Sequence, residues 1–495
     1  MNKQSKALME SFFRSKGLVE SSIRSYEAFI EKDMQRIVEE NKNLEPTIIP
    51  PNINDLKVTL EKIRIGKPII VEAEGSERPL YPKEARIRKL TYASPIYLTF
   101  NTKVNGKLSE TVEKNVGMLP IMLKSKYCLL SGLTRDELIE KGEDPYEPGG
   151  YFIINGTERI LVGVEDLASN HLMVESASTG PSKYIGRIFS SSGAYKIPTS
   201  IEKLNNGIIY ISFSRVRRIP FVILLKALGL MSDKEVMESV ARDYDFPEMV
   251  TNLYEGAGIT TTEDALDKIS KSLGITQSRE IRIERITEFI DSLFLPHIGS
   301  DEKSRMTKAQ NLCKMVRRFL LVSKGYLPED DKDHYKNKRL KLAGELMSDL
   351  FRVSLRTLIN DILYNFQRIV KRGKLPSFSV IVRSKLLTSR IYSAMATGNW
   401  IGGRSGVSQR IQRLNYLETL SHLQRVISPL SASQENFAAR ELHGTHLGRL
   451  CPVETPEGTP IGLKKNLSVF SHISGDTEEK EVLKALSDFG LKQVR

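Results

Sequence analysis

The sequence predicts an α+β fold divided into several domains. From Tyr92 to Phe100 apolar and polar residues alternate, as in a β-strand with one buried face. From Leu350 to Val370 apolar residues recur at three- to four-residue spacing, which is typical of one face of an α-helix. The chain has 495 residues, and this length favours roughly three domains.

The N-terminal part predicts a helix followed by strands. An apolar stripe at helical spacing runs from Leu18 to Glu40, and a short apolar segment from Val116 to Leu123 reads as a strand. Two apolar segments between Tyr151 and Val162 flank an Asn-Gly pair. This pair tolerates positive φ at both central positions of a type I′ turn, so we expect a β-hairpin here.

In the middle of the chain, strand patterns give way to helical patterns. A strand is expected over Ile208 to Phe213, after a second Asn-Gly pair. Helical patterns such as Ser232 to Arg242 and Thr261 to Leu273 then alternate with polar breaks, so residues 220–320 are interpreted as a separate, mostly helical insertion. From about residue 385 the chain is rich in Gly, Ser and Arg.

Composition excludes several classes of protein. The hydrophobic fraction is 40% and the charged fraction 27%, as in soluble globular chains. Three widely spaced cysteines form neither a disulfide framework nor a Cys-x-x-Cys zinc motif. The N-terminus lacks the apolar region of a secretory signal, and the longest apolar stretch, 220–231, is too short to span a bilayer. We therefore expect a cytoplasmic protein without membrane contact.

The charge balance favours a polyanionic partner. Lys and Arg number 73 and Asp and Glu number 60, which gives a net charge of +13. The window 381–465 contains 11 basic and 5 acidic residues, a net charge of +6. Arg dominates there, which suits phosphate contacts, whereas only Trp400 and Tyr416 could stack on bases. Gln409 and Arg413 would share a face if their segment were helical. A solvated basic surface is the alternative.

Common catalytic motifs are missing from the sequence, including the P-loop, G-x-G-x-x-G, H-E-x-x-H and G-x-S-x-G. Cys451 lies near His443 and His446, so a nucleophile or metal site is conceivable, but a buried thiol beside polar histidines is favoured. The acid-rich segment 329–339 has two interpretations. It could bind a metal ion, or it could be a solvated loop leading into a helix, which is preferred.

The segment from Cys451 to Gly462 is rigid because it contains three prolines and two glycines. Glu454 and Glu457 are held three residues apart on it. Such a loop could place groups beside a reacting centre, or it could be a tight turn whose carboxylates pair with nearby arginines.

Several of these segments together resemble the second-largest subunit of multisubunit DNA-directed RNA polymerases. The resemblance runs from about residue 15 to the end and includes the segment from Asp144 to Val162. It is carried in order by Thr397-Gly-Asn-Trp400, Gly406-Val-Ser-Gln409, Leu420-Ser-His-Leu-Gln-Arg425, Glu441-Leu-His443-Gly-Thr-His446 and Cys451-Pro-Val-Glu-Thr-Pro-Glu-Gly458. One departure is Lys336, which stands where the family usually has a small residue.

The resemblance implies a chain organisation. Members of this family are usually more than twice this long, so the chain looks like the N-terminal half from a split gene, as in certain archaea such as methanogens. The implied divisions are the first part of a protrusion (1–170), a lobe (171–325), the return segment of the protrusion (326–385), a fork (386–475), and the start of a following external region (476–495) that the gene split truncates.

The resemblance also implies roles for particular residues. The family holds its catalytic Mg²⁺ ions in another subunit, so neither catalytic residues nor metal ligands are expected here, and the isolated chain should be inactive. Glu454 and Glu457 would support the active centre. The residues expected near the nucleic acids are Gln409, Arg410, Arg413, Arg425, Arg440 and His443.

The implied partners are the C-terminal half of the same subunit, the largest polymerase subunits, smaller assembly subunits, basal transcription factors, template DNA and nascent RNA. Two other functions stay open on the residues alone. One is a stand-alone nucleic-acid-binding scaffold. The other is an independent metal-dependent nucleotidyl enzyme that uses Glu454, Glu457 and the acids at 329–333.

Overall fold

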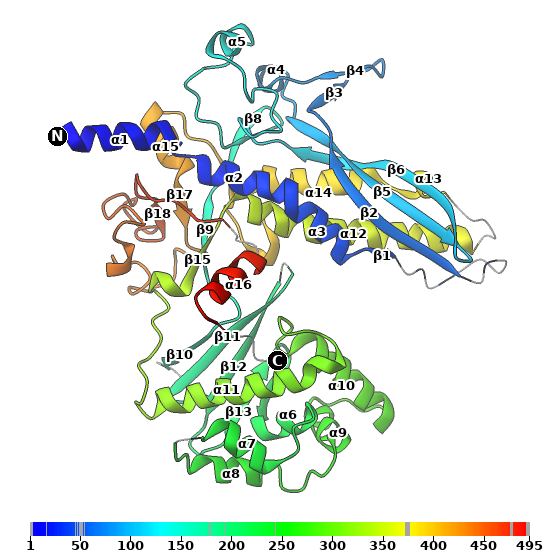
Figure 1. Ribbon diagram of the computed structural model, residues 1–495, viewed down its shortest axis with the longest axis vertical. Coiled ribbons are helices and arrows are strands. Elements are labelled where there is room, and N and C mark those ends of the chain that lie inside the picture. The colour runs from blue at the N-terminus through cyan, green and yellow to red at the C-terminus, as the bar shows by residue number, and fades with distance from the viewer. Residues whose placement is uncertain are drawn as a thin grey trace. The chain divides into compact units, whose positions relative to one another are not determined.

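The structure is a computed structural model that describes residues 3–15, 17–44, 46, 48, 53, 55–177, 180–193, 195–242, 244–371, 377–475 and 479–491. The chain forms two compact units (Figure 1). The first unit combines Met1–Asp166 with Leu340–Arg495, and the second is Leu167–Arg339. The inserted unit therefore begins well before residue 220, where the composition changes, and it extends beyond residue 325.

The first unit begins with helices. The helix expected over 18–40 is confirmed, with one π-helical turn in its middle, and it buries Tyr26, Phe29, Met34 and Ile37. The Tyr26 hydroxyl donates a hydrogen bond to the carbonyl of Pro120 at 2.6 Å, which ties this helix to the sheet. The elements are α1 (Lys3–Ser15), α2 (Glu20–Ala28), η1 (Phe29–Asp33) and α3 (Met34–Glu40).

A four-stranded antiparallel sheet with the order β1-β2-β5-β6 packs against helices from the later part of the chain. The strand expected over Tyr92 to Phe100 is confirmed as part of β5, and the segment 116–123 begins in β6 and leaves it at Pro120. The long helix expected over 350–370 is confirmed and begins earlier, at Ala343. The elements are β1 (Asn43–Leu44), β2 (Leu56–Ile65), β3 (Ile69–Val71), β4 (Glu77–Pro79), α4 (Pro82–Ile87), β5 (Ala93–Val104), β6 (Lys107–Pro120), α5 (Arg135–Glu140), α12 (Ala343–Val370), α13 (Phe378–Ile381) and α14 (Ser384–Thr397).

Two small sheets complete the first unit, with the orders β16-β8-β7 and β15-β9-β17-β18. The predicted hairpin is confirmed, because Asn155 and Gly156 have φ values of 50° and 75° between β7 and β8. The elements are β7 (Phe152–Ile154), β8 (Thr157–Leu161), β9 (Gly163–Leu167), β15 (Lys338–Lys341), η4 (Ile401–Gly403), β16 (Ser408–Arg410), α15 (Tyr416–Leu423), β17 (Arg425–Ile427), η5 (Gly444–His446), β18 (Lys464–Asn466) and α16 (Glu479–Asp488).

The second unit contains a five-stranded antiparallel sheet, β10 to β14 in sequence order, and a helical part. The strand over 208–213 and the helices at 232–242 and 261–273 are confirmed as β13, α7 and α9. The expectation of a mostly helical segment over 220–320 is confirmed, because the elements there are helices α6 to α11, but the unit begins earlier, at Leu167, and contains this sheet up to residue 220. The elements are β10 (Leu172–Ser176), β11 (Tyr184–Ser192), β12 (Tyr195–Lys203), β13 (Ile209–Phe213), β14 (Val216–Pro220), α6 (Phe221–Ala227), α7 (Asp233–Val240), α8 (Glu248–Tyr254), α9 (Thr262–Ser272), α10 (Arg279–Leu293), η2 (Glu302–Ser304), α11 (Arg305–Ser323) and η3 (Tyr335–Asn337).

Each unit has its own apolar core. The first core includes Phe29, Phe100 and Phe351, and the second includes Phe213 and Phe319. Within the described ranges, none of the helices combines the length and the apolar character that crossing a bilayer requires.

Candidate nucleic-acid interface

The framework of the candidate site is the continuous segment 157–167, which contributes β8 and then β9. In β8, Ile160 and Arg159 lie opposite Gln409 and Arg410 of β16. In β9, Gly163 lies beside Val426 of β17, which in turn pairs with β18. Segments more than 240 residues apart in the sequence, 157–167 and 408–427, are therefore held on one backbone scaffold.

Gln409 occupies β16, and Arg413 lies in the loop that follows it. The idea that these two side chains share a helix face is therefore wrong, because pairing with β8 makes the backbone of Gln409 extended. The Gln409 amide nitrogen donates to the carbonyl of Gly406 at 2.9 Å, and its amide oxygen lies 3.1 Å from Nε2 of His422.

His422 is a site residue that the sequence did not reveal. Its side chain is buried, and its Nδ1 accepts a hydrogen bond from the backbone N–H of Gln412 at 3.1 Å. Because Nδ1 accepts, the neutral ring carries its proton on Nε2, where it can donate to Gln409. Burial, followed by the positive charges of Arg425 and Lys464, lowers the pKa of His422 to about 4.

We expect the first unit to lose stability as the pH falls because of His422. Between pH 6.5 and 4 the unfolded chain binds a proton that the folded site excludes, so the free energy of unfolding should drop by about 2 kcal/mol from pH 7 to pH 5. A His422→Gln variant keeps a polar side chain but cannot titrate. Urea unfolding at both pH values should show a smaller loss for this variant, and equal losses for the two proteins would contradict the assignment.

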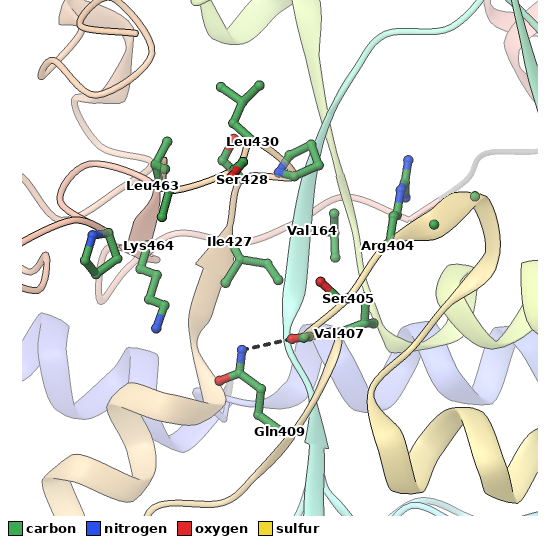
Figure 2. A pocket seen from close by; sticks show the side chains of 17 residues that line it. Val164, Arg404, Ser405, Val407, Gln409, Ile427, Ser428, Leu430, Leu463 and Lys464 are labelled. Atoms are coloured by element: carbon green, nitrogen blue, oxygen red, sulfur yellow. Dashed lines mark hydrogen bonds between the residues drawn. The ribbon is translucent and has the colours of Figure 1, made fainter. Parts of the chain in front are cut away.

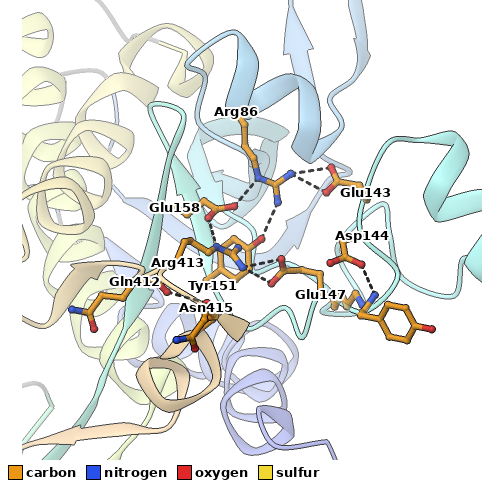
Figure 3. A network of polar contacts seen from close by, with 12 residues as sticks. Arg86, Glu143, Asp144, Glu147, Tyr151, Glu158, Gln412, Arg413 and Asn415 are labelled. Carbon is orange, nitrogen blue, oxygen red and sulfur yellow. Dashed lines mark hydrogen bonds and ion pairs between the residues drawn. The ribbon is translucent and has the colours of Figure 1, made fainter. Parts of the chain in front are cut away.

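Arg413 belongs to a partly buried network of ion pairs (Figure 3). Its guanidinium contacts Glu158 at 2.8 Å and Glu147 at 3.0 Å, and its Cζ lies 5.0 Å from the centre of the Tyr151 ring. Burial alone would raise the pKa of Glu158, but the hydrogen bond from Arg413 and the charges of Arg413 and Arg86 lower it below its usual value. The positive charge of Arg413 is thus largely compensated within the chain.

Arg86 joins the same network from helix α4. It donates to both carboxylate oxygens of Glu143, at 3.0 and 2.8 Å, to Glu158 at 2.8 Å, and to the Tyr151 hydroxyl at 2.8 Å. Glu143 is only 8% exposed, and the Arg86 guanidinium compensates its carboxylate. The network therefore fixes the loop that carries Arg413 against the β7–β8 hairpin.

Arg410 differs from Arg413 in its neighbours, because its exposed side chain lies opposite Arg159, another arginine. Within the described ranges no carboxylate pairs with either guanidinium. Like charges at directly opposite positions of an antiparallel pair are destabilising. The sheet thus retains an uncompensated pair of positive charges at this edge.

Arg425 and Arg440 are also engaged within the chain. The Arg425 guanidinium donates to the side-chain oxygen of Gln412 at 3.1 Å. Arg440 donates to four backbone carbonyls, those of Thr459, Ile461, Ala432 and Gln434, at 2.6 to 3.1 Å. It thereby closes the loop 431–441 onto the turn at 459–461.

His443, Glu454 and Glu457 lie in the loops around this closure. Nδ1 of His443 accepts from the backbone N–H of Thr445 at 3.2 Å and caps the short helix η5. Glu454 accepts a hydrogen bond from the hydroxyl of Ser421, and both Glu454 and Glu457 are exposed. Among the residues that the structure describes, no group of three or more His, Cys, Asp or Glu side chains could hold a metal ion.

A cavity of about 720 Å³ lies between these elements (Figure 2). Its polar wall includes Gln409, Lys464 and Arg404, and Arg404 is paired with Asp166 at 2.5 Å. Next to Lys464, Lys465 forms a buried ion pair with Glu165 at 2.9 Å, which joins β18 to β9. In the sequence, the adjacent lysines Lys464 and Lys465 were the local signal that could have indicated the ion pair with Glu165.

The structure thus brings Gln409, Arg410, Arg413 and Arg425 onto one framework, and it places Arg440, His443, Glu454 and Glu457 in the loops beside it. The sequence did not indicate the members that surround them. These are Arg86, Glu143, Glu147, Arg159, Glu165, His422 and Lys465.

Comparison with known proteins identifies the class to which this framework belongs. A family model described as RNA polymerase beta subunit matches residues 17–389, and one described as RNA polymerase Rpb2, domain 3, matches residues 409–473. The chain therefore belongs to the family of RNA polymerase beta subunits.

Individual relatives agree with this assignment. DNA-directed RNA polymerase subunit Rpo2N of Methanocaldococcus jannaschii is 43% identical over 493 residues, which cover 98% of both chains. Subunit Rpo2N of Halobacterium salinarum is 40% identical over 507 residues, covering 100% of this chain and 97% of the relative. Subunit Rpo2 of Saccharolobus shibatae is 44% identical over 490 residues, and the chain spans 43% of its length.

Proposed function

We propose that this chain is a subunit of DNA-directed RNA polymerase and forms part of the surface that holds the template DNA and the RNA–DNA hybrid during RNA synthesis. The observation that carries the proposal is the uncompensated pair Arg159–Arg410 on the β8–β16 ladder. Membership in the RNA polymerase beta subunit family supports it.

The argument rests on electrostatics. A pair of opposed arginines raises the free energy of the unliganded sheet, and a bound phosphate between them would remove that cost. Two planar guanidinium groups with free N–H donors suit the oxygens of a phosphodiester. Nearby, the Lys464 ammonium and the amide of Gln409 face the same cavity and add polar contacts.

The predicted site residues then divide into three groups by their proposed roles. Arg410 would contact nucleic acid directly, and the partly exposed Arg413 and Arg425 could add contacts through their remaining N–H donors. Arg440 and His443 would act by holding their loops, because their observed contacts lie within the chain. Glu454 and Glu457 would support basic groups near the incoming nucleotide from the rigid loop 451–462.

The chemistry implied is nucleotidyl transfer. Two Mg²⁺ ions would activate the RNA 3′-hydroxyl and stabilise the triphosphate, and we propose that another subunit holds them. The residues of this chain would bind and orient the nucleic acids. The proposed partners are the remaining half of the subunit, the largest subunits, the smaller assembly subunits and basal transcription factors.

An Arg410→Gln variant in the reassembled polymerase tests the proposed contact. Loss of one phosphate contact should reduce the slope of log affinity against log salt by about 0.7 to 0.9. Stability of stalled elongation complexes across a salt series measures this slope. The matched control is Arg64→Gln, which removes an exposed arginine paired with Glu113 on the β2–β6 sheet and should leave the slope unchanged.

Three outcomes would contradict the proposal. An unchanged slope in the Arg410→Gln enzyme would remove this arginine from the interface. RNA synthesis by the purified chain alone, with template, nucleotides and Mg²⁺, would instead favour an independent nucleotidyl enzyme. A chain that never co-purifies with a largest polymerase subunit would favour the stand-alone scaffold.

A further inference from the structure

The second unit contains a basic cavity of about 440 Å³ that lies outside the framework described above. It lies where the start of this unit meets α11 and the segment 330–339. The residues of its wall that carry charge or hydrogen-bonding groups include Ser169, His171, Arg318, Asp330, Lys336 and Arg339.

The single carboxylate of this wall is already satisfied. Asp330 accepts hydrogen bonds from Arg318 at 2.7 and 3.0 Å and from the backbone N–H of Val174 at 3.0 Å. Its side chain is only 8% exposed, so it has little capacity to neutralise further cations. One acid therefore balances one of three permanent positive charges, and the wall keeps a net charge of about +2.

The remaining donors of the wall suit an anionic ligand. Nε of Arg318 is buried and has no hydrogen-bond partner. Arg339 donates through Nη1 to the carbonyls of Lys336 and Lys338, and no carboxylate of the described residues pairs with it or with the ammonium of Lys336. A buried N–H without a partner costs about 1–3 kcal/mol, which an anionic acceptor would recover.

The positive groups converge on the same space. Burial, followed by the charges of Arg318, Lys336 and Arg339, keeps the pKa of His171 below its usual value, although Asp330 acts in the opposite direction. His171 is thus neutral near pH 7 and can offer one N–H donor in addition to the three cations.

The backbone that carries Lys336 and Arg339 is well anchored. The buried side chain of Asn337 donates to the carbonyl of Asp331 at 2.6 Å, and the backbone N–H of Ala168 donates to the carbonyl of Asn337 at 2.8 Å. Lys338 forms a largely buried ion pair with Asp333 at 3.2 Å. The acid-rich segment 329–339 thus holds the basic side chains of Lys336 and Arg339 at the wall of the cavity. Lys336, which departs from the family pattern, thereby contributes a positive charge to this wall.

We propose that this cavity binds a phosphate group of a nucleic-acid backbone, with Arg318, Lys336 and Arg339 as its donors. The proposal rests on the proposed function, since that function supplies the nucleic acid. Guanidinium and ammonium groups together recognise a phosphate through charge-assisted hydrogen bonds. The net charge of +13 on the whole chain favours a nucleic acid over a polypeptide as the partner.

The experiment measures binding of the full-length chain to a fluorescent 20-base-pair DNA duplex over a salt series. The double variant Lys336→Ala/Arg339→Ala should bind about tenfold or more weakly at low salt, and its slope of log affinity against log salt should fall by about 1.8. The control Lys303→Ala/Arg215→Ala removes the same charge from exposed positions of the same unit and should keep the wild-type slope. Equal effects of the two double variants would overturn the proposal.

A second measurement locates the contact. Acetylation of Lys336, followed by mass spectrometry, should be slowed several-fold by the duplex, while Lys303 should react at an unchanged rate. Protection by millimolar inorganic phosphate or by polyglutamate, without protection by DNA, would overturn the assignment to nucleic acid. DNA that binds but leaves Lys336 reactive contradicts this inference alone, whereas a wild-type chain that does not bind DNA contradicts the proposed function as well.

Discussion

Replacing Arg86 by methionine is expected to lower the free energy of unfolding of the first unit by about 3 kcal/mol or more. The substitution keeps much of the side-chain volume but removes the hydrogen bonds that Arg86 donates to Glu143, Glu158 and Tyr151. Glu143 would then be left as a buried carboxylate without its counter-ion.

Arg78→Met is the matched control for this prediction. Arg78 also contacts two carboxylates, Glu72 and Glu84, but it is an exposed residue whose side chain is 43% accessible. Surface ion pairs contribute about 0 to 1 kcal/mol, so its loss should be small. Chemical unfolding of both variants provides the measurement. Similar losses of unfolding free energy for Arg86→Met and Arg78→Met would show that the network in Figure 3 stabilises the protein no more than an exposed ion pair does.

Gly344→Ala is expected to destabilise the first unit by about 3 kcal/mol or more, although alanine normally favours a helix by about 1 kcal/mol over glycine. Gly344 lies in the first turn of α12, where its N–H donates to the hydroxyl of Ser25 in α2 at 3.1 Å. A Cβ atom at this position would lie 1.9 Å from the carbonyl oxygen of Ser25. The clashing atom belongs to the backbone, so only a separation of α2 and α12 could remove the clash.

The control for this glycine is Gly17→Ala, because no atom lies within 4 Å of a Cβ built there. This variant should change the free energy of unfolding by less than about 0.5 kcal/mol. Thermal and chemical unfolding of the two variants would separate a close helix contact from a general effect of added alanine. A Gly344→Ala protein as stable as the parent would mean that α2 and α12 do not approach closely.

Local patterns predicted the local structure of this chain well. The β7–β8 hairpin follows from Asn155-Gly156, since the turn conformation depends on those two residues themselves. The long helix α12 follows from its apolar period. Apart from β13, the strands of the second unit's sheet were not predicted, because they carry short alternating patterns and gain their stability from pairing with one another.

Predictions about residues whose conformation or contacts depend on distant segments of the chain were less accurate. Gln409 and Arg413 would share a face only on a helix, yet strand pairing with residues about 250 positions earlier makes Gln409 extended and leaves Arg413 in the loop that follows. The sequence indicated Arg410, Arg413 and Arg440 equally well as contacts for nucleic acid. Only the fold distinguishes Arg410, which keeps its donors free, from Arg413 and Arg440, which use theirs within the chain.

By itself, the sequence determined the polymerase-subunit resemblance, the basic window at 381–465 and the rigid loop at 451–462, because each depends on residues that are neighbours in the chain. The tertiary structure decided which charges are compensated. Arg86, Glu143, Glu158 and Arg413 come from four separate segments, and no local pattern relates them. Charge compensation depends on distances that only folding creates, and therefore the uncompensated groups became visible only in the folded chain.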